Sequence, residues 1–127
     1  MPTIRITTLG LGHGPAPATD IPLIDLRPYR DPHVSPQMRQ MTARDQLVRD
    51  TVRTTPGIPQ LLAATVTEIT AYAARHPQQD TITAATACVG GKHRAAAFGM
   101  DLQEALQVLG YTVTRHDRDI DKPVINH

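Results

Sequence analysis

The sequence Thr81-Ile-Thr-Ala-Ala-Thr-Ala-Cys-Val-Gly-Gly-Lys-His-Arg94 decides the fold. Its first nine residues are small, apolar or β-branched and carry no charge, which is typical of a strand buried in a parallel sheet. Gly90 and Gly91 follow directly and end the strand. Apolar residues then recur at helical spacing. The segment therefore predicts a central strand over Thr81–Val89 that a glycine turn joins to a helix beginning near His93.

The rest of the chain alternates strand and helix patterns around this segment. Three further strands are predicted over Thr3–Leu9, Pro22–Arg27 and Tyr111–Arg115. Two further helices are predicted, one from the capping sequence Thr42–Asp45 to about Arg53, and one from Ile58 to His76. Three prolines between Pro28 and Pro36 disfavour a helix there. Alternating elements predict an α/β fold with four to five strands, in which helices cover a mainly parallel sheet.

The composition fits one globular domain over residues 1–127, because a chain of this length supports one core. Hydrophobic residues make up 40% and charged residues 20%. Thirteen Lys and Arg residues nearly balance twelve Asp and Glu residues, so the chain lacks the field that attracts nucleic acid or an anionic membrane. One Phe, three Tyr and no Trp are too few to build a base-stacking surface.

Location and metal content are predicted from what the sequence lacks. The single cysteine, Cys88, has no partner for an internal disulfide, which fits a reducing cytosol. Residues 1–12 lack the apolar core of a signal peptide, and no apolar run approaches the ~20 residues that cross a bilayer. Six histidines form no H-E-x-x-H motif. We expect a cytoplasmic protein with no metal, no cofactor and no membrane contact.

The turn from Cys88 to Arg94 has the features of an anion-binding loop. Two glycines let backbone N–H groups turn inward, and the start of a helix adds further N–H groups and the positive end of its dipole. Lys92, His93 and Arg94 add cationic donors. Together these groups suit a phosphate. The structural alternative is a tight strand-to-helix turn with cations on the surface.

The same turn also reads as Cys-x5-Arg, the pattern of protein tyrosine and low-molecular-weight phosphatases. In that interpretation Cys88 is a nucleophile and Arg94 clamps the phosphate, and loop N–H groups with nearby cations favour the thiolate. Ala95 stands where those enzymes carry Ser or Thr, a hydroxyl that helps the cysteine leave. Asp31 is a candidate acid in the proline-rich loop. A buried structural cysteine is the simpler alternative for Cys88.

Two separated motifs resemble the RapZ (RNase adapter protein) C-terminal domain family. The first is CVGGKHRAA, followed by a helix and then by VTRHDRDIDKPV. The second comprises Asp25-Leu26-Arg27, Asp31-Pro32-His33, Arg39, Met41-Thr42 and Asp45. The resemblance covers about residues 4–124. Full-length relatives place this domain after a P-loop kinase-like domain, and no G-x-x-x-x-G-K-[ST] sequence occurs in these residues.

The resemblance implies a domain that binds glucosamine-6-phosphate as a metabolite sensor and regulatory adapter, without catalysis. The residues carried over are Asp25, Arg27, Cys88, Val89, Gly90, Gly91, His93 and Arg94, with His33 as an addition. The phosphate would lie on the glycine loop, and Asp25 would face hydroxyl or ammonium groups. A local Asp25–Arg27 ion pair and a turn-capping role for His33 are the structural alternatives.

RNA is the other ligand that the resemblance implies, since enterobacterial relatives bind small RNAs. Here Asp117, Asp119 and Asp121 offset the cations of the tail from Arg115 to Lys122, so little neutralisation of RNA phosphates is expected. Three hypotheses follow, in this order: a phosphosugar-binding sensor, a phosphate-ester hydrolase, and a module for RNA or a protein partner. The sequence allows a homo-oligomer and does not determine the oligomeric state.

Overall fold

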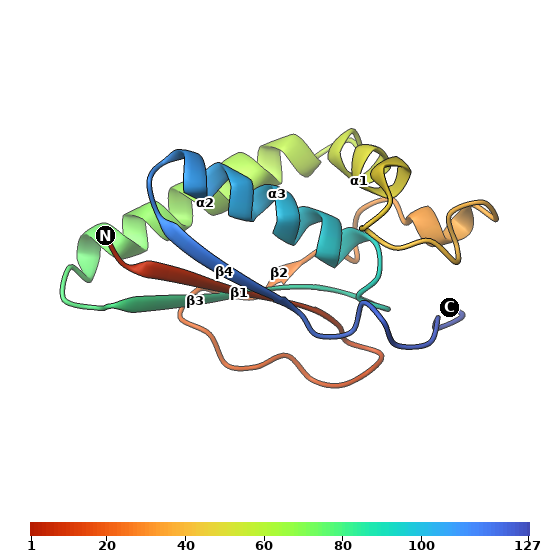
Figure 1. Ribbon diagram of the computed structural model, residues 1–127, viewed down its shortest axis with the longest axis horizontal. Helices are drawn as coiled ribbons and strands as arrows, with labels where there is room; N and C mark the ends of the chain where they lie inside the picture. The colour runs from red at the N-terminus through yellow and green to blue at the C-terminus, as the bar shows by residue number, and fades with distance from the viewer.

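A four-stranded parallel sheet forms the centre of the computed structural model, which describes residues 1–127. Its strands stand in the order β2-β3-β1-β4, and every neighbouring pair is parallel. The strands are β1 (Thr3–Gly10), β2 (Ile24–Asp25), β3 (Thr81–Cys88) and β4 (Thr112–Asp117). Figure 1 shows all four running in one direction, so their carboxyl ends meet at one edge.

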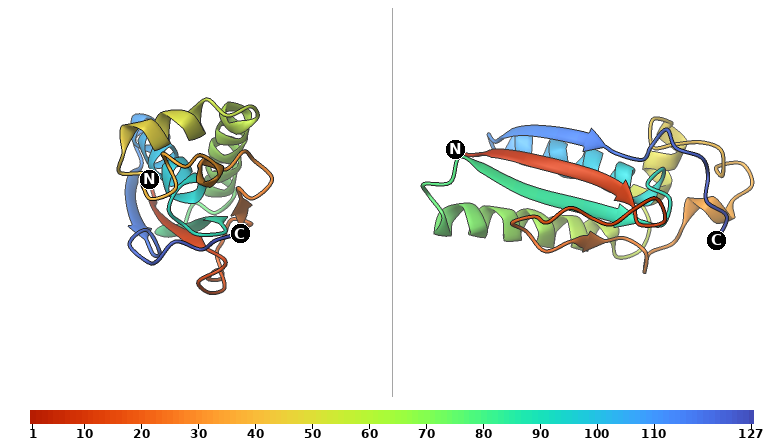
Figure 2. Two further views of the ribbon diagram at one scale, coloured as in Figure 1. Left: turned by 90° about the vertical axis from the view of Figure 1, so that its right-hand side faces the viewer. Right: turned by 90° about the horizontal axis from the view of Figure 1, so that it is seen from below.

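Three α-helices and one short 3-10 helix connect the strands. They are α1 (Gln46–Arg53), α2 (Ile58–Arg75), α3 (Arg94–Val108) and the 3-10 helix Pro32–Val34. Both long helices, α2 and α3, lie on the same face of the sheet, while α1 lies beyond the carboxyl edge (Figure 1). Figure 2 shows the other face, which no helix covers. The predicted α/β class is confirmed, with helices on one face of the sheet. None of the helices combines the length and apolar character that crossing a bilayer requires.

The core lies between the sheet and the two long helices. Alternate residues of β1, including Ile4 and Ile6, are fully buried and face this layer. From α3, Phe98 and Leu102 pack against them. Gly99 lets α3 approach closely, because a Cβ at this position would overlap the Thr8 side chain of β1. This close contact holds the first half of α3 against β1.

Two predicted segments differ from the structure, a strand in its length and a loop in its conformation. The predicted strand Pro22–Arg27 is reduced to Ile24 and Asp25, because Pro22 and Pro28 lack the N–H that a ladder needs. The proline-rich segment contains one turn of 3-10 helix, in which Pro32 takes the first position and Asp31 accepts from the His33 N–H. Proline suits the first turn of a helix, where its missing N–H costs nothing.

Candidate anion-binding site

The loops after β2 and β3 meet at the carboxyl edge of the sheet, because the two strands are neighbours. Arg94, the first residue of α3, joins them. Its Nη1 donates to the Arg27 and Tyr29 carbonyls at 2.9 and 3.0 Å, and its Nη2 donates to Asp31 Oδ2 at 3.1 Å. The side chain is only 5% exposed. Arg94 therefore holds the β2 loop against the start of α3.

The two glycines of the turn have different surroundings. Gly91 has a φ of 76°, and a Cβ there would lie 2.6 Å from the Gly10 nitrogen. Only glycine fits this position. Other residues rarely adopt a positive φ, and their Cβ would clash with the end of β1. A Cβ on Gly90 would meet no heavy atom within 4 Å. Gly91 is thus required for packing, and Gly90 lies on the open side of the loop.

Backbone N–H groups gather at this turn, and several have no partner in the protein. Those of Gly91 and Ala95 donate to the Cys88 sulfur at 3.2 and 3.4 Å. The N–H groups of Gly90, Lys92, His93 and Arg94 donate to no protein atom. The N-cap residue of α3, His93, makes no side-chain cap bond. Free N–H groups at the start of a 15-residue helix are the usual setting for an anion.

The three side chains that the sequence offers as cationic donors are engaged within the protein. Lys92 Nζ donates to the Ile120 carbonyl at 2.9 Å. His93 is buried, and its Nε2 lies 2.8 Å from the Met41 carbonyl, to which it donates. Burial lowers the pKa of His93, so the ring is neutral near pH 7. Arg94 bridges the loops as described, although its buried Nε has no partner. The turn therefore offers backbone donors more freely than cationic side chains.

Asp25 and Arg27 form a local ion pair at the end of β2. Arg27 Nε and Nη2 donate to the Asp25 carboxylate at 3.0 and 2.8 Å. The hydrogen bond from Arg27 lowers the pKa of Asp25. Asp25 lies beside Ala87 in register, so the pair borders the residue that precedes Cys88. About half of the Arg27 side chain is exposed, which leaves the pair open to a ligand.

His33 is buried, and it does not cap the turn with its side chain. Its own backbone N–H is capped by Asp31. Asp31 Oδ1 accepts from the His33 N–H at 2.9 Å, and the His33 ring lies 6.5 Å from the His93 ring, between centroids. Burial lowers the pKa of His33. The His127 ring stacks on the His33 ring, with centroids 4.6 Å apart. No sequence pattern connects His127 with this cluster, because 96 residues separate it from Asp31.

Cys88 does not have the environment of a nucleophile. The thiol is buried, and this burial raises its pKa despite the hydrogen bonds from Ala95 and Gly91. The loop N–H groups and the charge of Arg94 do lower the pKa of Cys88, as the sequence predicts, but the loss of solvation on burial outweighs them and raises the pKa overall. Val89, which follows, is half-buried and begins the turn.

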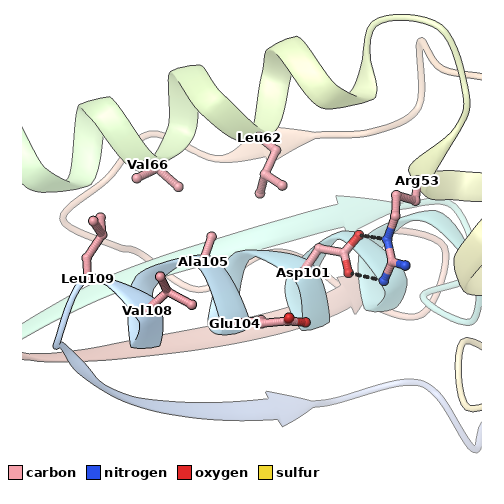
Figure 3. A pocket seen from close by; sticks show the side chains of 8 residues that line it. All are labelled: Arg53, Leu62, Val66, Asp101, Glu104, Ala105, Val108 and Leu109. Carbon is pink, nitrogen blue, oxygen red and sulfur yellow. Dashed lines mark hydrogen bonds and ion pairs between the residues drawn. The ribbon is translucent and has the colours of Figure 1, made fainter.

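The largest cavity lies away from this turn, in a groove of about 480 Å³ between α2 and α3 (Figure 3). Leu62 and Val66 of α2 face Ala105 and Val108 of α3 across it. The Arg53–Asp101 ion pair closes one end at 2.8 Å. None of the site residues predicted from the sequence lines the groove, and it holds no cluster of free donors. We therefore place the candidate site at the glycine turn.

The chain is similar to known proteins and to a known family. The chain is 30% identical over 122 residues to a nucleotide-binding protein of Bifidobacterium adolescentis, and the match covers 94% of the chain and 39% of the relative. It is 33% identical over 104 residues to a nucleotide-binding protein of Thermus thermophilus, covering 81% and 38%. The chain thus spans about 40% of the length of these relatives. The family model described as the RapZ C-terminal domain matches residues 2–121. The chain belongs to the RapZ C-terminal domain family.

Proposed function

We propose that the turn from Cys88 to Arg94 binds the phosphate of a small phosphorylated sugar, such as glucosamine-6-phosphate, and that the domain acts as a sensor. The observation that carries this proposal is the set of free N–H groups at Gly90, Lys92, His93 and Arg94. They lie at the uncapped start of α3, where the helix dipole favours an anion. Arg94 adds a fixed positive charge directly behind the turn.

The sugar part is assigned to the neighbouring strand end. Asp25 accepts hydrogen bonds only, so its carboxylate suits the hydroxyl or ammonium groups of an amino sugar. Arg27 holds this carboxylate in a bidentate pair and leaves half of its own side chain exposed. His33, next to Asp31 on the second loop, is the third side chain that we assign to the ligand.

Binding without catalysis is the form of this proposal that the chemistry favours. A phosphatase needs a thiolate nucleophile, and burial stabilises the protonated thiol of Cys88. Ala95 supplies no hydroxyl to the leaving sulfur. The candidate acid, Asp31, is engaged by Arg94 and the His33 N–H. Three parts of a Cys-x5-Arg mechanism are therefore missing or occupied.

Calorimetric titration tests the proposal with four ligands: glucosamine-6-phosphate, glucose-6-phosphate, inorganic phosphate and adenosine monophosphate. The nucleotide is included because the longer relatives carry the name nucleotide-binding protein. We expect the amino-sugar phosphate to bind most tightly and inorganic phosphate to compete with it. Tighter binding of the nucleotide would replace the sugar in the proposal, and no binding of any phosphate would contradict it.

Two substitutions locate the phosphate and the sugar separately. Gly90→Ala places a methyl group on the open side of the turn, and we expect it to weaken both inorganic phosphate and sugar phosphate. Arg27→Ala should weaken the sugar phosphate alone. The matched control is Arg75→Ala, which removes an equal charge from the end of α2, away from the turn. Equal losses in Arg27→Ala and Arg75→Ala would show that only net charge matters.

A further inference from the structure

The groove between α2 and α3 is an apolar surface that the fold leaves open. Leu62 and Val66 form its α2 side and pack against the hydrophobic core, so this side is fixed in place. Val108 and Leu109, at the end of α3, lie on its other side and are 81% and 51% exposed. Figure 3 shows the four side chains around the space between the two helices. Contiguous apolar surface with a polar rim marks interaction sites in soluble proteins.

The rim of this groove has a surplus of negative charge. Arg53 Nε and Nη2 donate to the Asp101 carboxylate at 3.1 and 2.8 Å, and Arg53 Nη1 lies 3.7 Å from Asp50 Oδ1. Glu104, on the next turn of α3, is exposed and forms no ion pair (Figure 3). Three carboxylates therefore outnumber the one guanidinium, and the other lining residues supply no cation. A cation on an occupant of the groove would find its partner at Glu104.

The shape of the groove fits one further helix. Its two walls are helices that lie on the same face of the sheet (Figure 1). Between Asp101 and Val108, α3 rises about 10 Å, which is two helical turns. A helix that lies along this length meets it with residues at positions i, i+4 and i+7 of one face. The side-chain ridge of such a helix packs into the groove between two others in the way that helices ordinarily pack.

We propose that this groove binds an amphipathic helix of a partner protein, whose apolar stripe covers Val108 and Leu109 and whose Lys or Arg pairs with Glu104. The inference is independent of the phosphosugar site, because no residue of the glycine turn lines the groove. A second copy of the chain does not supply this helix. Outside the groove, the α-helices expose one large apolar side chain, Leu47. Two grooves in contact would also bring their surplus carboxylates together.

A designed peptide tests the groove on the full chain without any phosphate ligand. The peptide has about 16 residues, enough to populate a helix in water, with Leu at i, i+4, i+7 and i+11 and one Lys beside this stripe. A scrambled peptide has the same composition and no stripe. Fluorescence anisotropy of the labelled peptides measures their affinity. We expect the amphipathic peptide to bind and the scrambled peptide not to bind. Equal binding of both peptides, or binding of neither, would overturn the proposal.

A substitution at the exposed end of α3 locates the peptide. Val108→Ser removes apolar surface without opening the core, and we expect it to weaken the peptide about tenfold, as the loss of one buried apolar side chain does. The matched control is Val34→Ser, which removes another exposed valine from the 3-10 helix, outside the groove. Equal affinities in the two variants would overturn the assignment to the groove.

Charge reversal tests the polar contact. Glu104→Lys should weaken the Lys peptide and strengthen a peptide with Glu in place of this Lys, each by up to about fivefold, the range of an exposed ion pair. Glu68→Lys is the control, since Glu68 is exposed on α2 and does not line the groove. An unchanged preference in Glu104→Lys would overturn the cationic partner. Sedimentation of the protein alone that shows a dimer, lost in Val108→Ser, would assign the groove to a second copy and overturn the partner helix.

Discussion

Two charged junctions lie side by side at the carboxyl edge of the sheet, and they use their polar groups in opposite ways. At the end of β4, the Asp119 carboxylate is fully buried and accepts from the Gly10 N–H, from Arg118 and from Lys122 at 2.8, 2.8 and 2.5 Å. Arg118 also donates to the Pro15 and Gly14 carbonyls at 2.6 and 3.0 Å. The polar groups of this junction are hydrogen-bonded to one another, and they connect the end of β4 to the loop after β1.

The glycine turn after β3 leaves its donors unused. The side chains of Lys92, His93 and Arg94 donate to protein carbonyls, while the four N–H groups of Gly90, Lys92, His93 and Arg94 have no protein partner. The two junctions touch, since a Cβ on Gly91 would lie 3.0 Å from that of Asp119. The comparison shows that charge alone does not identify a binding site in this chain. Backbone N–H groups without a protein partner identify the site. The Asp119 junction, whose polar groups are all hydrogen-bonded and which we call the saturated junction, packs against the turn that carries them.

The largest expected effect comes from breaking the saturated junction. Asp119→Ala leaves Arg118 and Lys122 without their shared carboxylate and the Gly10 N–H without an acceptor. Hydrogen bonds to charged groups contribute about 1.5–3 kcal/mol each, and the two cations left behind are partly exposed, so we expect a loss of about 2–3 kcal/mol in the free energy of unfolding. Urea denaturation measures it. A loss below about 1 kcal/mol, the usual limit for exposed pairs, would show that this junction is not a structural support.

Acid should weaken the same junction, because it protonates the Asp119 carboxylate. Burial alone would raise the pKa of Asp119, but Arg118, Lys122 and the Gly10 N–H lower it to about 2 in the folded protein. The unfolded carboxyl titrates near 3.8, so the stabilisation is complete above that pH and is lost as the pH falls through about 2. The difference corresponds to about 2 kcal/mol. Denaturation curves of wild type and Asp119→Asn should converge over this range, and parallel curves would contradict the assignment.

The two glycines of the turn give a smaller and more selective test. Gly91→Ala places a side chain on a φ of 76°, which costs about 1–2 kcal/mol, and forces the turn away from Gly10. Gly90→Ala has open space and should change the free energy of unfolding by less than about 0.5 kcal/mol. Thermal denaturation compares the two variants. Equal destabilisation would remove the distinction between the packed and the open side of the turn.

The sequence predicts the local parts of this molecule well. The strand Thr81–Cys88, the glycine turn and the helix after it follow from residue types within one short segment, and the structure confirms them. The Asp25–Arg27 pair is also local, and it is one of the two alternatives that the sequence allowed. The length of β2 is missed, because an edge strand is limited by its partner β3 and by flanking prolines rather than by its own apolar pattern.

The long-range contacts of the candidate site could not be predicted in this way. Arg94 is a cation beside two glycines in the sequence, which suggests a phosphate clamp, but the fold brings it to carbonyls more than 60 residues away. The contact between His127 and Asp31 depends on how the chain returns after β4. The sequence suggests Asp31 as a candidate acid, and the structure shows that it caps a proline-led turn and accepts from Arg94. Which donors remain free can be read only once these partners are known.

The smallest expected effect concerns Cys88, and it separates a binding turn from a catalytic one. The Cys88 sulfur accepts two N–H groups from inside the turn, so it shapes the loop from the buried side. Serine keeps an acceptor at this position, and we expect Cys88→Ser to change phosphosugar affinity by less than about 1 kcal/mol, within the range of one neutral hydrogen bond. The wild type should not hydrolyse an aryl phosphate, since burial holds the thiol in its protonated form.

Calorimetry and a phosphate-release assay on the same two proteins decide the matter. Steady hydrolysis by the wild type that disappears in Cys88→Ser would mean that a bound substrate deprotonates the thiol despite its burial, and the turn would then be a phosphatase loop. If both proteins bind the phosphosugar and neither hydrolyses the aryl phosphate, the backbone N–H groups of the turn bind the ligand and the Cys88 thiol is not required. In that outcome the cysteine and the saturated junction at Asp119 act alike, as supports that hold Gly90 and the start of α3 open to an anion.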